Sequence, residues 1–192
     1  MKQAILITAY KNIEHLIRIV DFFNDEYSFY IHIDKKSNIP ETKIEKLKSD
    51  KKVRLVSRQY SVNWGSLEHL KAILLLSQAC AKDTDVKYVH LITGQDFPIK
   101  SPEEITSFLE ENYGTEFMTG SALPHPLWKN GGMHRIYYYN LYECFNGRNW
   151  QRIFIKGFVL LQKAVGYKRK QPSNLPKLHG GSTYWTLTME AV

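Results

Sequence analysis

The chain has 192 residues, of which 43% are hydrophobic and 13% aromatic, which is enough for one domain with a sizeable buried core. Charged residues make up 23% and no segment is low in complexity, so the disordered, collagen-like and coiled-coil classes are excluded. The net charge of +7 suits polyanions such as nucleic acid, anionic lipid or a nucleotide diphosphate, and equally an ordinary solvated surface, so charge alone does not choose.

The first third of the chain predicts a strand, a helix and a second strand. Residues 3–9 form a short apolar run typical of a strand buried on both faces, and they lack the features of a signal peptide. Residues 28–34 are rich in β-branched and aromatic side chains and predict the second strand. Between them, behind a potential cap at Asn12, apolar residues recur at helical spacing: Ile13, Leu16, Ile17, Val20 and Phe23.

The alternation of strands and helices continues through the middle of the chain. Residues 41–48 predict a polar helix, residues 52–56 a third strand and residues 88–92 a fourth apolar strand. Residues 66–79 predict a helix whose apolar face carries Leu67, Leu70, Leu74 and Leu75. This order predicts an α/β fold with a mostly parallel sheet flanked by helices.

A capping box announces the next helix. Ser101 and Glu104 have the Ser-x-x-Glu spacing, with Pro102 at the first helical position, so a helix is expected over residues 102–112.

The last third is less regular. We expect a strand at residues 135–142, a helix at about 150–165 and a strand at 183–187, followed by residues 188–192 as the beginning of a further helix. An incomplete last helix predicts that the sequence is an excerpt from a longer protein. The chain has no stretch of about 18 apolar residues, and its two cysteines make no disulfide framework, so we expect a soluble chain in a reducing compartment.

Ligands of open parallel sheets bind at the carboxyl ends of the strands, which directs attention to the residues that follow each strand. These are Thr8, Asp34, residues 62–66 and residues 93–98. Asp34 could accept a hydrogen bond from a base N–H or a ribose hydroxyl, and Trp64 could supply a flat apolar wall. The competing interpretations are an aspartate that stabilises a turn and a tryptophan of the core.

Other chemical motifs are absent or misplaced. Asp83 and Asp85 form an Asp-x-Asp pair, but they precede the fourth strand at the amino edge, so we expect a solvated loop there and no metal site. No P-loop, dinucleotide-binding glycine motif, His-Glu-x-x-His motif or nucleophile elbow occurs. Scattered basic residues also argue against a nucleic-acid reader.

Several strings together resemble one family, the core-2/I-branching N-acetylglucosaminyltransferases and peptide O-xylosyltransferases. They occur in the family's order and run from the first strand to the last residue, with residues 123–177 matching only loosely. The strings are Tyr30–Asn38, Trp64-Gly65, Leu91–Lys100 and Gly180–Thr188.

The resemblance implies a bacterial member with a GT-A-like fold and an inverting, metal-independent transfer of a sugar from a UDP-sugar. By position, the uridine contacts would be Thr8, Asp34, Val62, Asn63 and Trp64. The positions near the donor sugar or acceptor would be Asp96, Glu116, Arg135, Ser182 and Thr183. Xylosyltransferase-like members are expected to carry an acidic residue where Thr183 stands, which argues against UDP-xylose as donor.

The reaction needs a carboxylate base to deprotonate the acceptor hydroxyl and positive charge to stabilise the departing UDP. In the family both follow the Gly-Ser-containing strand, so the base is expected beyond Val192, with Asp96 and Glu116 as rivals within the chain.

The sequence therefore predicts that residues 1–192 form a single nucleotide-sugar-binding glycosyltransferase domain, truncated at its C-terminus and without a cofactor. N-acetylglucosamine or a similar hexose would pass to a glycan or lipid-linked glycan acceptor in polysaccharide biosynthesis. The location would be cytoplasmic, with peripheral contact at the anionic inner face of the cell membrane as a further option and no nucleic-acid partner. A catalytically inert carbohydrate- or nucleotide-binding module on the same fold is the alternative.

Overall fold

The computed structural model describes residues 1–172 and 174–192. They form two compact units. The first comprises Met1–Val62, Leu70–Met118 and Thr183–Val192, and the second comprises Asn63–His69 and Thr119–Ser182. The expectation of one nucleotide-sugar-binding domain stays a prediction.

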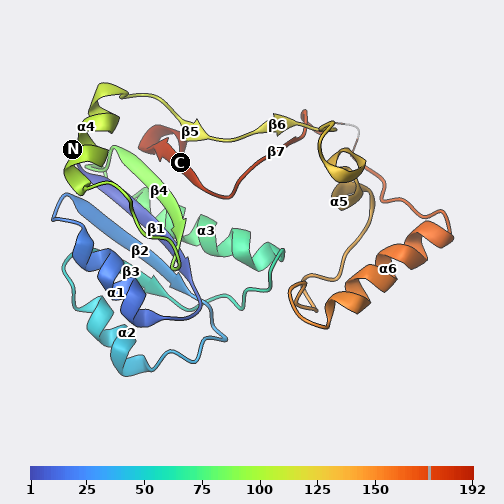
Figure 1. Cartoon of the computed structure of the whole chain (residues 1–192), viewed down its shortest axis with the longest axis horizontal. Helices are drawn as coiled ribbons and strands as arrows, with labels where there is room; N and C mark the ends of the chain where they lie inside the picture. The colour runs from blue at the N-terminus through green and yellow to red at the C-terminus, as the bar shows by residue number, and fades with distance from the viewer. Residues whose placement is uncertain (173) are drawn as a thin grey trace. The chain divides into compact units, whose positions relative to one another are not determined.

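A six-stranded sheet in the order β3-β2-β1-β4-β8-β5 organises the first unit (Figure 1). Strands β1 (Gln3–Ala9), β2 (Tyr27–Ile33), β3 (Val53–Ser57) and β4 (Tyr88–Thr93) pair in parallel, as the alternation of strands and helices predicts. Strand β8 (Trp185–Thr188) is antiparallel to β4, and β5 (Phe117–Met118) is antiparallel to β8. The predicted α/β fold with a mostly parallel sheet is confirmed.

Two apolar clusters cover the two faces of this sheet. On one face α1 (Ile13–Phe22) and α2 (Glu41–Lys48) pack against residues such as Ile5 and Ile7 of β1. On the other face α3 (Leu67–Cys80) packs against Ala4 and Leu6 of the same strand. The alternation of side chains along β1 thus supplies both clusters.

The expected apolar face of α3 is wrong. Leu67, Leu70 and Leu74 are half exposed, whereas the buried residues of this helix are Ala72, Ile73, Leu76, Ser77 and Cys80. Because apolar residues occur all round this helix, spacing alone did not identify the side that packs against the sheet.

Helix α4 (Pro102–Glu111) begins as the capping box predicts. The amide of Glu104 donates to Ser101 Oγ over 3.2 Å, and the amide of Ser101 donates to Glu104 Oε2 over 3.0 Å. The helix ends at its C-cap, Asn112.

The second unit has little regular structure. It contains a two-stranded sheet of β6 (Ser121–Ala122) and β7 (His179–Gly180), a 3-10 turn η1 (Lys129–Gly132), α5 (His134–Tyr137) and α6 (Arg152–Ala164). Helix α6 confirms the helix expected at residues 150–165.

The expected strand at residues 135–142 is wrong, because residues 134–137 form one helical turn and residues 138–142 have no strand partner. The amides of Ile136 and Tyr137 both donate to Met133 O, at 2.9 and 3.0 Å. Local turn bonds therefore override the β-propensity of this aromatic run.

A 3-10 turn, η2 (Met189–Ala191), follows β8, in line with the helical start expected there. Among the described residues, every helix is too short or too polar to cross a bilayer.

Candidate functional site

The carboxyl ends of the parallel strands bring the expected residues of the first unit together. The sheet register pairs Thr8 with His32 on β2 and with Thr93 on β4. The amide of Asp34 donates to Ala9 O over 2.8 Å, and the amide of Gly94 donates to Thr8 O over 2.9 Å. A side chain at Gly94 would place its Cβ 2.7 Å from that of Ala9, so this glycine permits the close approach of the two strand ends.

Asp34 is buried at this edge, with 8% of its surface exposed. Its Oδ1 accepts hydrogen bonds from the amides of Lys36, at 2.9 Å, and Val62, at 3.2 Å. Its Oδ2 accepts no hydrogen bond from the residues that the structure describes. One oxygen thus fixes the loops after β2 and β3, and the other is the atom that a ligand N–H or hydroxyl could reach.

Two basic side chains lie beside Asp34 that the sequence analysis treated only as part of the general charge. Lys36 Nζ donates to Val62 O over 2.9 Å, and Arg58 donates to Ser37 O over 2.7 Å and to Glu41 Oε2 over 3.1 Å. Their position directly after β2 and β3 was the available signal. Lys36 adds positive charge to the strand-end edge, and the charge of Arg58 is paired there with that of Glu41.

Asp96 lies in the turn after β4. Its Oδ2 accepts hydrogen bonds from the amide of Thr93, at 2.7 Å, and from Thr93 Oγ1, at 2.9 Å. Its backbone oxygen lies 3.0 Å from His15 Nε2. Asp96 therefore reaches the expected edge, where it also stabilises the turn.

Thr183 and Glu116 lie at opposite ends of the antiparallel part of the sheet. Trp185 pairs with Leu91, so Thr183 lies two residues closer to the carboxyl end of β4 and is exposed. Glu116 instead precedes β5, and its carboxylate accepts hydrogen bonds from Thr188 N at 2.8 Å and Thr188 Oγ1 at 2.5 Å. Because Thr188 pairs with Tyr88 at the amino end of β4, the position of Glu116 favours a structural role.

In the second unit, the turn at residues 63–66 is held by side chains. Asn63 Nδ2 donates to Tyr142 O and Glu143 O, at 3.3 and 3.2 Å. The ring of Trp64 lies edge-on to that of Tyr142, and the Arg148 guanidinium lies 5.4 Å from its centroid. Trp64 is thus half exposed and is not a core tryptophan, and its role as a wall for a ligand stays a prediction.

Sequence reasoning missed Glu143, whose Oε1 accepts a hydrogen bond from the Leu67 amide at the start of α3. A carboxylate at this position complements the positive end of the helix dipole. Glu143 and the start of α3 are far apart in the sequence, and no local sequence pattern indicates that they are in contact.

Arg135 and Ser182, the remaining candidates, also lie in the second unit. Arg135 is exposed on α5, and the Ser182 amide donates to Thr119 Oγ1 over 3.1 Å. Next to Ser182, a Cβ on Gly181 would lie 1.8 Å from Thr119 O, so close backbone packing requires this glycine.

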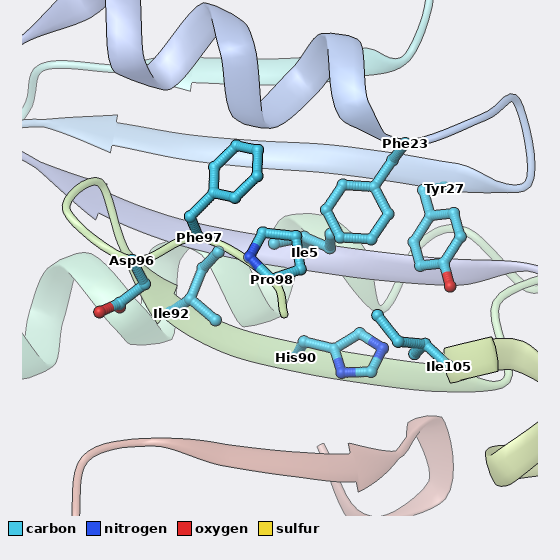
Figure 2. Close-up of a pocket in the computed structure, with 9 residues that line it drawn as sticks. All are labelled: Ile5, Phe23, Tyr27, His90, Ile92, Asp96, Phe97, Pro98 and Ile105. Carbon is cyan, nitrogen blue, oxygen red and sulfur yellow. The ribbon is translucent and has the colours of Figure 1, made fainter. Parts of the chain in front are cut away.

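A separate cavity of about 160 Å³ lies in the first unit over β1 and β4 (Figure 2). Its lining is mainly apolar and consists of Ile5, Phe23, Tyr27, His90, Ile92, Asp96, Phe97, Pro98 and Ile105. The polar groups of its two polar rings, Tyr27 and His90, are already hydrogen-bonded within the protein. Tyr27 OH donates to Pro102 O, and the His90 ring nitrogens contact Gln3 and Thr186. Ligand pockets are usually at least about 300 Å³, so this cavity is small for a nucleotide.

Asp83 and Asp85 lie at the amino edge, as expected from the sequence. Asp85 Oδ2 accepts a hydrogen bond from Lys2 Nζ at 2.8 Å, and both this hydrogen bond and the lysine charge lower the pKa of Asp85. The described residues contain no cluster of three or more His, Cys, Asp or Glu side chains able to hold a metal ion.

The model of one protein family, the Core-2/I-Branching enzyme family, matches residues 4–192. The chain belongs to this family. The resemblance noted in the sequence is confirmed, and the parallel sheet with flanking helices is consistent with a GT-A-like domain of Core-2/I-branching enzymes.

Curated relatives of this Core-2/I-branching chain are xylosyltransferases by name. Xylosyltransferase oxt of Drosophila melanogaster is 25% identical over 58% of this chain and 13% of its own length. Xylosyltransferase 2 of Canis lupus familiaris is 24% identical over 71% of this chain and 16% of its own length. The match thus spans less than a fifth of the length of these relatives. Their names and the family model identify the family as one of glycosyltransferases.

Proposed function

We propose that this chain provides the donor-nucleotide side of a glycosyltransferase that uses a UDP-sugar. The observation that carries the proposal is Asp34, a buried carboxylate at the carboxyl end of β2 with one oxygen engaged by two loop amides. The uracil N–H or a ribose hydroxyl would donate to the other oxygen. Thr8 and Val62 border the same edge, and Asn63 and Trp64 remain predicted uridine contacts.

The charge of the diphosphate would be balanced by protein side chains, not by a metal ion. Lys36 and Arg58 lie at the strand-end edge, and ammonium and guanidinium groups bind phosphate oxygens directly. Stabilising the departing UDP with fixed positive groups is the electrostatic task that the transfer requires. The presence of Lys36 and Arg58 at this edge supports the proposal of a metal-independent reaction.

The transferred sugar is proposed to be N-acetylglucosamine or a similar hexose, with inversion at the anomeric carbon. In a single displacement a carboxylate takes the proton from the acceptor hydroxyl as its oxygen forms the new bond, and the bond to UDP breaks. The xylosyltransferase names of the relatives favour xylose, whereas Thr183, in place of an acidic residue, argues against it.

An inert binding module on the same fold is the second candidate. It is favoured by the hydrogen bonds that two carboxylates accept from neighbouring residues, Asp96 at Oδ2 from Thr93 and Glu116 at both oxygens from Thr188. Transfer to a glycan acceptor by a protein that contains this chain would exclude the module.

Calorimetry with UDP tests the proposal. Asp34→Asn keeps an oxygen for the amides of Lys36 and Val62 but removes the charge, and it should weaken UDP binding by about 1–3 kcal/mol because a buried ligand group loses its partner. Asp25→Asn, at an exposed ion pair with Lys51, is the matched control and should bind like the native chain. Equal UDP affinity for the native chain and Asp34→Asn would contradict the proposal.

The metal question is tested in the same assay. Chelator should leave UDP affinity unchanged, because Asp83 and Asp85 lie at the edge opposite Asp34. A gain of affinity with Mn²⁺ that is lost in Asp85→Asn would show that the Asp-x-Asp pair binds a metal.

A further inference from the structure

Helix α6 carries large apolar side chains that the other described residues of the second unit leave exposed. Only Ile155 and Gln162 of this helix are buried. Large apolar side chains are exposed along α6 and directly beside its two ends: Trp150, Ile153, Phe154, Leu160, Leu161 and Val165. Their exposure reaches 73% at Trp150 and 69% at Val165, which is far more than packing within this unit explains.

The segment around this helix is exclusively basic. Between Cys144 and Met189 the sequence contains no Asp or Glu and eight basic residues: Arg148, Arg152, Lys156, Lys163, Lys168, Arg169, Lys170 and Lys177. Since the whole chain has a net charge of +7, the remaining sequence is close to neutral. The excess positive charge of the protein therefore lies in the segment that contains α6.

Tyrosines hold part of this charge in place near the end of α6. The Lys163 ammonium lies 5.4 Å from the ring centroid of Tyr138, and the Arg169 guanidinium lies 5.2 Å from that of Tyr139. Lys168 lies 5.7 Å from the ring of Tyr137. Tyr and Trp side chains, together with basic residues, are typical of the boundary between water and lipid headgroups.

We propose that the α6 face, defined by its six exposed apolar residues and the basic residues beside it, docks on an anionic lipid bilayer. The apolar residues would enter the boundary between headgroups and acyl chains while the basic side chains contact lipid phosphates. A second copy of this chain is a poor occupant, because two such faces would bring like charges together. Nucleic acid would leave the aliphatic side chains without partners.

This docking surface does not depend on the proposed donor site, because none of the side chains altered below, on α6 and at residues 168–170, is a donor-site candidate. It would place the chain at a membrane, where a lipid-linked acceptor is found. Variants of α6 should therefore change lipid binding and leave UDP binding unchanged, so the two proposals fail independently.

Vesicle flotation tests the apolar contribution. The native chain should float with phosphatidylcholine vesicles that contain phosphatidylglycerol and remain unbound with pure phosphatidylcholine. Leu160→Asp with Leu161→Asp should lower the partition coefficient about 10-fold to 100-fold, because two exposed leucines no longer enter the bilayer. Leu70→Asp with Leu74→Asp is the matched control, since those leucines on α3 are 50% and 49% exposed, and it should bind like the native chain.

A second set of variants tests the charge without altering the apolar face. Lys168→Gln, Arg169→Gln and Lys170→Gln together should weaken binding to anionic vesicles about 100-fold, since each basic side chain near the surface contributes about fivefold. Lys46→Gln, Lys82→Gln and Lys87→Gln change the net charge equally at other exposed sites and should have a much smaller effect.

Helical content measured by circular dichroism should be the same in all variants, because every altered side chain is exposed. The proposal is overturned if the native chain fails to bind anionic vesicles, if it binds neutral vesicles equally, or if the α6 variants and their controls behave alike. Dimers that dissociate in Leu160→Asp/Leu161→Asp without any lipid binding would identify a second copy as the occupant. Tight binding of nucleic acid by the native chain that is lost in the triple variant of residues 168–170 would likewise overturn the membrane proposal.

Discussion

His90 is a neutral histidine within the sheet, next to the cavity of Figure 2. Its Nδ1 lies 2.9 Å from Thr186 Oγ1 and its Nε2 lies 2.9 Å from Gln3 Oε1. Gln3 Nε2 in turn donates to Thr106 Oγ1 over 2.8 Å, so the hydrogen bonds link β8, β4, β1 and α4. Burial lowers the pKa of His90 to about 4.

This histidine should make the stability depend on pH. Its folded pKa of about 4 lies below the unfolded value of about 6.5, so the unfolded chain binds the proton more readily. Its stabilising contribution is full above about pH 6.5 and decreases as the pH falls toward 4, by about 2–3 kcal/mol at pH 4.5. Urea unfolding at pH 7 and pH 4.5 measures the loss.

His90→Gln provides the comparison, because glutamine cannot gain the proton. Its unfolding free energy should decrease less between pH 7 and pH 4.5 than that of the native chain. His69, whose pKa is also lowered by burial, remains in both proteins and cancels. The same pH dependence in both proteins would contradict the assignment to His90.

Some site residues could be placed from the sequence and others could not. Asp34 and Asp96 directly follow strands that are evident from apolar runs, so the rule for parallel sheets located them correctly. Glu116 depends on the pairing of β5 with β8, which joins segments about 70 residues apart and has no local signal. The Arg148 side chain against Trp64 is another such long-range contact.

At the scale of elements, the start of α4 tests the energetic value of a cap. Ser101→Ala should destabilise the protein by about 1 kcal/mol, because the Glu104 amide loses its acceptor. Ser101→Asp keeps an acceptor next to the same amide and should lose much less. Chemical denaturation of the three proteins measures the difference, and equal stability of Ser101→Ala and the native chain would show that the cap has no net value.

Two glycines of the second unit should respond oppositely to alanine. Gly181→Ala would place a methyl group 1.8 Å from Thr119 O, so the backbone must move and about 1–3 kcal/mol should be lost. Gly157→Ala lies inside α6 with no atom within 4 Å of the new Cβ, and it should stabilise the helix by about 1 kcal/mol.

Hydrogen exchange can resolve the two glycine variants within the second unit. The Leu123 amide, which donates to Leu178 O beside the β6–β7 pair, should exchange faster in Gly181→Ala. Amides of α6 should exchange more slowly in Gly157→Ala. Unchanged exchange at Leu123 would indicate that the backbone near Thr119 accommodates the methyl group.

Elements with strong local signals were predictable, and those decided by tertiary contacts were not. The capping box of α4 and the apolar runs of β1, β2 and β4 define their elements within a few residues. The aromatic run at residues 135–142 has high β-propensity but no strand beside it, and it therefore forms a turn of helix and a loop. In α3, Leu67, Leu70 and Leu74 are half exposed, whereas Ile73, Leu76 and Cys80 pack in one cluster with Ala4 and Leu6.

At the scale of the whole molecule, alternation of strands and helices predicted the parallel part of the sheet but not its completion. Strands β8 and β5 are short and join β4 from distant parts of the sequence, so only the fold reveals the antiparallel edge. The division into two units also has no clear sequence signal. Among the described residues of the range 119–182, Ile155 is the only apolar residue of the buried core.

The last prediction concerns catalysis by this 192-residue chain alone. We expect it to release UDP from UDP-N-acetylglucosamine at the rate of a protein-free blank, even if it binds UDP. The rate needs a carboxylate base near the anomeric carbon. Asp34 holds two loop amides, Asp96 holds Thr93, and Glu116 holds Thr188 at the amino end of β4, so each has a structural task.

A coupled assay for UDP measures this release, with Asp96→Asn and Glu116→Gln as companion variants. Release above the blank that disappears in Asp96→Asn would place a catalytic carboxylate in the turn after β4 and contradict the prediction. Loss only in Glu116→Gln would identify the other rival, against its position at the amino edge. Because Asp96 Oδ2 accepts two hydrogen bonds from Thr93, Asp96→Asn should also be checked for unchanged UDP affinity, which separates a lost base from a disturbed turn.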